Sequence, residues 1–268
     1  MTSKSFDIAL LAGQRPGQDP LAAAFGQELK ALVEINGRNM LARMLDILPH
    51  ICGARRIFVL AQQADLLAAH IGKPWLDAHP HVVFRTCGPS ISGTLIDLLA
   101  SPDADFPLMV TTVDNVLLTP AIAKHFLDIC HQDDADVVAA MVEARTLLRA
   151  YPHNRRTWLK FRGGAYSGAN LFWFASNKAL PVLEIWRNIE QHRKKGRAVI
   201  GAFGLPLLLG AVLRILSLSQ ALAIAGRRIG VRAKPAILPF AEAAIDVDKP
   251  DDHMLVTTIL AGRPPSEA

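Results

Sequence analysis

Short apolar runs alternate with segments of helical spacing through the first half of the chain. The runs predict strands over residues 8–12, 56–61, 81–85, 106–113 and 136–142, with a shorter extended piece over 31–35. Apolar residues with helical spacing predict helices over 40–48, 64–71, 92–100 and 120–131. This alternation predicts an α/β fold with a doubly wound, mostly parallel, Rossmann-like sheet. The ligand crevice of such a sheet lies at the carboxyl ends of its strands.

The pattern changes after residue 143. Two β-rich segments precede two helices, two late extended pieces and a final helix; these elements cover 158–161, 163–174, 178–195, 219–229, 237–240, 244–247 and 250–260. We expect one domain over residues 1–262, in which 143–235 forms a basic α+β insertion or lid, and a flexible tail over 263–268.

Composition favours a globular protein with a small anionic ligand. The chain has 268 residues, 51% of them apolar, which is enough to bury a full core. A formal net charge of +5 favours an anionic partner. The basic residues are not gathered in a run with interleaved aromatic residues, so we expect small phosphorylated molecules and no nucleic acid.

The cysteines and the N-terminal sequence predict a cytoplasmic protein. Cys52, Cys87 and Cys130 are far apart and form no C-x-x-C pair, so neither a zinc site nor a disulfide framework is indicated. The first apolar run is too short for a secretory core and meets Gly13 and Arg15 at once, so we expect no export signal.

The most apolar stretch is residues 199–213 (VIGAFGLPLLLGAVL). It is shorter than the roughly 20 residues that cross a bilayer. One interpretation is a buried helix. The other is a surface that makes peripheral membrane contact or receives a lipid-like substrate, because four arginines follow it at Arg214, Arg227, Arg228 and Arg232.

The loop after the first strand is a candidate nucleotide site. Gly13 ends the apolar run, and a residue without Cβ lets backbone N–H groups approach phosphate oxygens. We expect this loop to bind a triphosphate, with Arg15 and Lys30 adding positive charge. The loop residues of this prediction are Leu11, Ala12, Gly13, Gln14 and Arg15. A glycine after a strand is also an ordinary turn, which is the alternative.

Polar residues near two further strand ends can complete a nucleotide site. Gln62 follows the second strand, and Ser92, Gly93 and Thr94 open a helix with hydroxyl and N–H groups. Serine and threonine at a helix start are also common caps, so a purely structural role is the alternative for this group.

Three aspartates are candidate metal ligands. Asp114 stands at the end of a predicted strand, and Asp246 and Asp248 flank Val247 in a late extended segment. Alternation places the last two on one face, so they can converge with Asp114 on one Mg²⁺, or on Mn²⁺ in its place. Such an ion can bridge the α-phosphate of a nucleotide to an attacking phosphate. A helix-capping role is the alternative for each aspartate singly.

Three segments resemble the MobA-like NTP transferases, the molybdenum-cofactor guanylyltransferase-like nucleotidyltransferases. They are LLAGQRPG with Lys30 downstream, TTVDN around Asp114, and IDVDKPDD near the C-terminus. Sugar-phosphate and methylerythritol-phosphate cytidylyltransferases are more distant relatives. The resemblance covers residues 6–142 and 236–260 and implies the nucleotide-diphospho-sugar transferase type of fold. It also implies an enzyme that transfers a nucleoside monophosphate from CTP or GTP to a phosphorylated small-molecule acceptor, with Mg²⁺, and releases pyrophosphate.

The resemblance also implies residue roles. Gly13, Arg15 and Lys30 would hold the triphosphate, Ser92, Gly93 and Thr94 would lie near the base or ribose, and Asp114 with Asp246 or Asp248 would bind Mg²⁺. Arg15, Lys30 and Asp114 would be the catalytic residues. The chain departs from the family pattern at Gln14, where a second glycine is usual, and in the longer interval before Lys30.

The acceptor site is predicted in the basic middle region. The candidates are Lys160, Arg162, Tyr166 and Asn170, and the acceptor is a sugar phosphate, a cofactor phosphate, a phosphorylated polyol or a lipid head-group precursor. One alternative function is a metal-dependent glycosyltransferase, although the D-x-D common in such enzymes is absent at Asp114. Another is a non-catalytic nucleotide-binding regulator, because the first loop departs from the family pattern.

Overall fold

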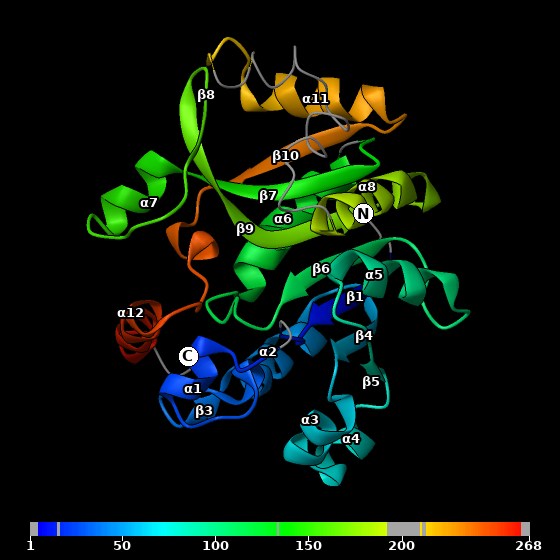
Figure 1. Cartoon of the computed structure of the whole chain (residues 1–268), viewed down its shortest axis with the longest axis vertical. Helices are drawn as coiled ribbons and strands as arrows, with labels where there is room; N and C mark the ends of the chain where they lie inside the picture. Colours follow the sequence, from blue (N-terminus) through cyan, green and yellow to red (C-terminus); the bar gives the residue numbers. More distant parts are fainter. Residues whose placement is uncertain (1–4, 15–16, 133, 192–209, 211–212, 264–268) are drawn as a thin grey trace.

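A computed structural model describes residues 5–14, 17–132, 134–191, 210 and 213–263 (Figure 1). Residues 264–268 of the tail predicted at 263–268 lie outside these ranges, as does most of the apolar stretch at 199–213, for which membrane contact was one interpretation. Within the ranges, no helix combines the length and the apolar character needed to cross a membrane.

A mixed eight-stranded sheet forms the centre of the molecule. Seven strands lie in the order β10-β7-β9-β6-β1-β4-β5, and β8 pairs with β9. Only β9 runs antiparallel to its neighbours along this order; the other pairs are parallel. The strands are β1 (Phe6–Leu11), β4 (Ala54–Ala61), β5 (Val82–Thr86), β6 (Leu108–Thr112), β7 (Val137–Glu143), β8 (Leu159–Phe161), β9 (Gly164–Phe174) and β10 (Ala233–Leu238). The predicted mostly parallel α/β sheet is confirmed.

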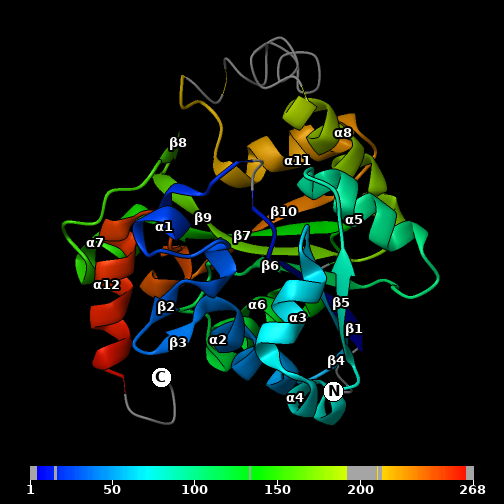
Figure 2. The same cartoon turned by 60° about the horizontal axis from the view of Figure 1, so that its bottom comes forward.

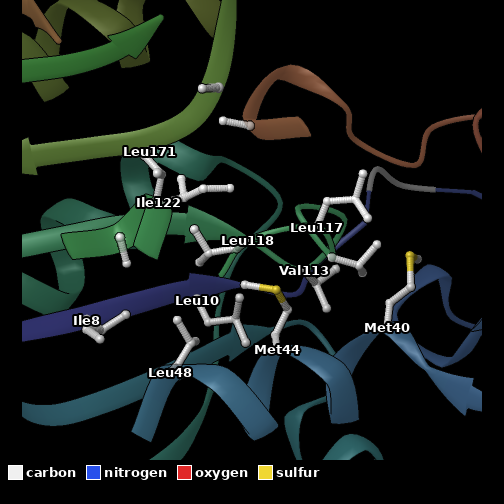
Figure 3. Packing of buried hydrophobic residues seen from close by; sticks show 14 of the residues in the cluster. Ile8, Leu10, Met40, Met44, Leu48, Val113, Leu117, Leu118, Ile122 and Leu171 are labelled. Atoms are coloured by element: carbon white, nitrogen blue, oxygen red, sulfur yellow. The ribbon is translucent and has the colours of Figure 1, made fainter. Parts of the chain in front are cut away.

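Helices cover both faces of this sheet, because apolar residues point alternately to its two sides. On one side, Ile8 and Leu10 of β1 pack in one buried cluster with α2 (Met40–Ile47), α6 (Pro120–Gln132) and α12 (Pro250–Ala261). Figure 3 shows side chains of β1, α2 and the segment between β6 and α6 meeting in this cluster. On the other side, Ala9 packs in a second cluster with α5 (Ile91–Ala100) and α8 (Leu180–Gln191).

Further helices, turns and a small hairpin make up the other described elements. They are α1 (Pro20–Ala24), η1 (Lys30–Leu32), β2 (Glu34–Ile35), β3 (Arg38–Asn39), η2 (Leu48–His50), α3 (Ala64–Ile71), α4 (Lys73–Ala78), α7 (Ala144–Ala150), η3 (Asn177–Ala179), α11 (Leu218–Arg228) and η4 (Ala241–Ala244). The β2–β3 hairpin lies beside α1 and α12 (Figures 1 and 2). Hydrogen bonds from Asn36 to the Thr257 carbonyl and between His253 and the Glu34 carbonyl hold α12 to this hairpin.

The late extended pieces predicted at 237–240 and 244–247 are placed wrongly. The strand β10 begins earlier, at Ala233, and residues 241–244 form the 3-10 turn η4. The pattern missed β10 because it contains Pro235, a residue that lacks a backbone N–H. Proline is tolerated here because β10 is an edge strand. The extended piece predicted at 31–35 is shorter in the structure, because Lys30–Leu32 forms a 3-10 turn and only Glu34–Ile35 forms the strand β2.

The region predicted as a lid or insertion contributes to the central sheet. The strand β9 pairs with β6 on one side and β7 on the other, and its first residues pair with β8. Apolar periodicity indicated this strand but carries no information on its direction or its neighbours. Its central position brings Asn170 next to the carboxyl end of β6.

Candidate functional site

Backbone hydrogen bonds bring three distant segments together at the carboxyl end of the sheet. The Val113 N–H donates to the Leu11 carbonyl at 3.0 Å, which joins the ends of β6 and β1. The Val247 N–H donates to the Asp114 carbonyl at 3.1 Å, and the Val247 side chain is fully buried. The segment that carries Asp246 and Asp248 is therefore fixed against Asp114, at the edge where open α/β sheets bind ligands.

Lys30 links two of the three predicted carboxylates. Its Nζ lies 2.6 Å from Asp114 Oδ2 and 2.6 Å from Asp248 Oδ1. The side chains of Lys30 and Asp114 are only 12% and 14% exposed, whereas Asp248 is 61% exposed. The Thr112 hydroxyl donates to the other oxygen of Asp114. The result is a largely buried ammonium held by charge-assisted hydrogen bonds.

Burial and charge shift both partners of this ion pair. Burial lowers the pKa of Lys30, but the carboxylates of Asp114 and Asp248 outweigh this effect and raise the pKa above its usual value. Burial also raises the pKa of the Asp114 carboxyl, against the opposing effect of Lys30 and Thr112, and the nearby Asp246 raises it further. The Lys30 ammonium is thus charged across the neutral pH range. Its positive charge stabilises the ionised form of the neighbouring Asp114 carboxyl.

Asp246 is held by different partners. Arg156 donates from Nη1 to Asp246 Oδ1 and from Nη2 to the Asp246 backbone carbonyl, the latter at 3.2 Å. Asn170 Nδ2 donates to Asp246 Oδ2 at 3.1 Å, from a left-handed backbone conformation with φ +48°. Both oxygens of this carboxylate therefore have partners. Within the described ranges, no group of three or more His, Cys, Asp or Glu residues is arranged to hold a metal ion by itself.

Gln62, which follows β4, forms hydrogen bonds to the loop after β1 and to the loop after β5. Its Oε1 accepts from the Gln14 N–H at 2.9 Å, and its Nε2 donates to the Gly88 carbonyl at 3.2 Å. A Cβ at Gly13 would lie 2.8 Å from Gln62 Oε1, closer than van der Waals contact allows. Glycine at this position thus permits the Gln62 bridge, and Gln62 contacts the predicted nucleotide loop directly.

The Gln14 side chain makes two hydrogen bonds that the sequence did not predict. Its Oε1 accepts from the Lys30 N–H at 3.0 Å, and its Nε2 donates to the Glu28 carbonyl at 3.3 Å. A second glycine could make neither bond. The Gln14 side chain therefore connects the loop after β1 to the turn that carries Lys30, across the long interval between them.

The other residues of the predicted nucleotide site differ in exposure. Leu11 is partly buried and Ala12 is buried, with its N–H bonded to the Leu60 carbonyl. Arg15 lies outside the described residues. The side chains of Ser92 and Thr94 are buried at the start of α5, where Ser90 rather than either of them accepts from the Gly93 N–H, at 3.0 Å. Ser90 is the N-cap of this helix.

Of the four predicted acceptor residues, Asn170 alone is seen to contact the aspartates. Lys160 is exposed on β8, and Tyr166 is half-buried on β9, where it pairs with Leu159 and Glu143. Arg162 Nη2 donates to Gln220 Oε1 of α11 at 3.0 Å. Lys160 and Tyr166 thus lie on the paired strands β8 and β9, and Arg162 lies in the turn between these strands.

Sequence reasoning missed Arg156 and Thr112 as residues of this site. Arg156 belongs to the basic segment between α7 and β8, but nothing in the local pattern distinguishes it from its neighbour Arg155. Thr112 is the last residue of β6, two positions before Asp114, and this i, i+2 spacing was the available signal.

Comparison with known proteins shows the family and the fold of the chain. The sequence model of the MobA-like NTP transferase domain matches residues 11–229. A solved structure of a hypothetical transferase from Thermus thermophilus is 25% identical, with a TM-score of 0.74, over 93% of this chain and 99% of that one. A search of curated proteins finds no matching sequence.

Two further solved structures share the fold at lower identity. One is 4-diphosphocytidyl-2C-methyl-D-erythritol synthase from Anaerococcus prevotii, with 9% identity, TM-score 0.57, and 97% and 99% of the two chains covered. The other is CMP:2-keto-3-deoxy-manno-octonic acid synthetase complexed with CTP, with 12% identity, TM-score 0.56, and 96% and 99% covered. The family match spans most of the sequence, and the chain belongs to the MobA-like NTP transferase domain family.

Proposed function

We propose that the protein transfers a nucleoside monophosphate from CTP or GTP to a phosphorylated small-molecule acceptor and releases pyrophosphate. The observation that carries this proposal is the bridge from Lys30 Nζ to Asp114 and Asp248, beside the glycine loop at the carboxyl end of the sheet. A buried ammonium and a pair of acidic groups at this edge are the charges that a triphosphate and its cation require.

The triphosphate would lie on the loop after β1. Gly13 supplies backbone without a Cβ at the bend, and Lys30, with Arg15, supplies positive charge. These groups would stabilise the charge that builds on the phosphates as pyrophosphate departs. The reaction needs no covalent nucleophile, because orientation of the acceptor phosphate and neutralisation of charge are the main demands.

A divalent cation, Mg²⁺ or Mn²⁺, fits the donor chemistry of this corner. Three carboxylates face two basic side chains, Lys30 and Arg156, so negative charge is in excess, and Mg²⁺ is commonly bound by one or two carboxylates together with substrate phosphates. We assign the ligand role to Asp114 and Asp248. When bound, such an ion would polarise the α-phosphate and neutralise charge at the attacked phosphorus.

We assign Asp246 a positioning role. Its two oxygens accept from Arg156 and Asn170, and the Val247 N–H next to it bonds to the Asp114 carbonyl. These contacts orient the segment so that Asp248 reaches Lys30. Asn170 would act in the same way, while Lys160, Arg162 and Tyr166 stay the candidates for binding the acceptor on the β8–β9 side.

Pyrophosphate release tests the proposal. Each of CTP and GTP is incubated with Mg²⁺ and a panel of phosphorylated sugars, polyols and cofactor precursors. We expect pyrophosphate to form with one nucleotide and only when a suitable acceptor is present. Release of a nucleoside diphosphate from a nucleotide sugar, with no pyrophosphate from any triphosphate, would support the glycosyltransferase alternative instead.

A further inference from the structure

The Lys30 ammonium lies between two carboxylates, as a metal ion would. Asp114 Oδ2 and Asp248 Oδ1 are each 2.6 Å from the same nitrogen, so these oxygens lie within about twice that distance of each other. Two oxygens on one Mg²⁺, each about 2.1 Å away, lie at most about 4.2 Å apart, which is within this upper limit. The same two oxygens can therefore bind either the ammonium or a metal ion, but they cannot bind both tightly at once.

The two cations would also repel one another. Lys30 and Asp114 are largely buried, and charges a few ångströms apart interact more strongly there than in water. A divalent ion that entered while Lys30 kept both hydrogen bonds would meet a positive charge at contact distance. Its binding to the nucleotide-free protein must therefore displace the ammonium from at least one aspartate.

The surrounding contacts allow Lys30 to move while Arg156 stays. A lysine carries three donors on a flexible four-carbon stem, whereas Arg156 grips Asp246 with two nitrogen atoms of a planar guanidinium. The backbone of Lys30 is fixed by Gln14, and Gln14 is fixed in turn by Gln62. The side chain of Lys30 can thus swing from a stationary base beside the loop that would hold the phosphates.

We propose that Lys30 is an exchangeable counter-ion. In the nucleotide-free protein it occupies Asp114 and Asp248 and keeps divalent cations out. A bound triphosphate offers the ammonium new anionic partners, so the two aspartates become available to the metal. This inference rests on the proposed function and adds that nucleotide and divalent cation bind to the site cooperatively. By linkage, the cation then tightens nucleotide binding by the same factor.

The test is the affinity of the nucleotide-free protein for Mn²⁺, measured by electron paramagnetic resonance of the free ion. We expect Lys30→Met to bind Mn²⁺ about tenfold more tightly than the unmodified protein, within the usual range of coupling between sites. The matched control is Lys124→Met, which removes a lysine–aspartate pair of 2.6 Å on the exposed side of α6 and should leave the affinity unchanged. Equal or weaker binding by the Lys30 variant would overturn the inference.

Two further measurements separate this inference from the proposed function. Lys30→Gln repeats the experiment with a polar side chain, so that a folding defect of one variant, seen by circular dichroism, does not decide the result. Asp114→Asn tests the metal site itself in the presence of CTP or GTP. If Asp114→Asn abolishes Mn²⁺ binding but neither Lys30 variant tightens it, the exchange is wrong and the metal site stands. If Asp114→Asn has no effect, the proposed metal site is wrong.

Discussion

Two ion pairs at the carboxyl end of the sheet have similar composition and differ in the cation and in its number of acidic partners. Arg156 and Asp246 form the first, with side chains 12% and 21% exposed, and both carboxylate oxygens of Asp246 accept hydrogen bonds. Lys30 forms the second with Asp114 and Asp248 together, and one of those aspartates is 61% exposed. In the first pair two nitrogen atoms of one guanidinium contact the same aspartate, whereas in the second pair two aspartates share a single ammonium.

This difference separates a structural pair from a functional one. A carboxylate whose oxygens are both satisfied by fixed donors has little to offer a ligand, whereas two carboxylates that share one flexible cation can exchange it. In the proposed reaction, the Arg156 pair would position the segment 245–248, and the Lys30 pair would contact the substrate. Substitutions at the two pairs should then act on different quantities, namely stability for the first and catalysis for the second.

The largest expected effect is the loss of catalysis on Asp114→Ala. Removing this carboxylate should lower Mg²⁺-dependent turnover by about 10³-fold, the size typical of losing one strong electrostatic contact to a transition state. The fold should persist, because the main-chain bond from Val247 to the Asp114 carbonyl does not need the side chain. Steady-state pyrophosphate release gives the rate, with Asp46→Ala as a control at an exposed ion pair. Full activity of Asp114→Ala would rule out its metal role.

The next largest effect falls on stability at the other pair. Arg156→Met leaves Asp246 partly buried without its main counter-charge, and breaking a buried ion pair costs about 3 kcal/mol. Asp248→Asn, at an exposed position, should change the free energy of unfolding by less than about 1 kcal/mol. Urea denaturation of both variants measures the contrast. Equal destabilisation would mean that the two pairs do not divide their roles in this way.

A smaller effect is expected at the first loop. Gly13→Ala places a Cβ against Gln62 Oε1, so the bridge from Gln62 to Gln14 and Gly88 must loosen. Losing well-formed hydrogen bonds of this kind costs about 1.4 kcal/mol, which is tenfold in nucleotide affinity.

A double-mutant cycle checks this cause. In a Gln62→Ala background the added Cβ no longer clashes with the Gln62 side chain. Gly13→Ala should then weaken nucleotide binding much less than it does in the unmodified protein. Additive losses in the double variant would show that the alanine acts on the phosphates directly rather than through Gln62.

The smallest expected effect concerns Thr112, whose hydroxyl donates to Asp114. Thr112→Val keeps the shape of the residue and removes the donor, which should destabilise the protein by about 1 kcal/mol and lower turnover only a few-fold. Thr112→Ser, which keeps the hydroxyl, is the matched control and should retain activity. A loss as large as that of Asp114→Ala would give Thr112 a direct role in the reaction.

Local patterns were enough to predict five of the parallel strands, all but β10, and the edge at which the candidate site lies. The run that ends at Gly13, and the strand that ends before Asp114, each depend on a few consecutive residues. The carboxyl ends of parallel strands meet at one edge, so Lys30, Asp114 and Asp248 could be expected near one another. Their convergence on the lysine ammonium could not, because it depends on side-chain geometry across 218 residues of sequence.

Long-range contacts account for what the sequence did not reveal. Arg156 is one of several basic residues in its segment, and only its approach to Asp246, 90 positions away, distinguishes it. The place of β9 between β6 and β7 is also a matter of pairing, which apolar periodicity does not encode. Gln14 interrupts the expected glycine pattern, and its use became clear only when its side chain was seen to hold the Lys30 N–H.

A nucleotide and metal site at Asp114 can be tested by a thermal-shift comparison of the unmodified protein and Asp114→Ala with the four nucleoside triphosphates, with and without Mg²⁺. A ligand at 100 times its Kd stabilises the native state by about 2.7 kcal/mol. We predict that CTP or GTP raises the Tm of the unmodified protein, more strongly with Mg²⁺, and that Asp114→Ala loses the Mg²⁺-dependent part. An equal Mg²⁺-dependent shift in both proteins, or no shift with any triphosphate, would contradict the account.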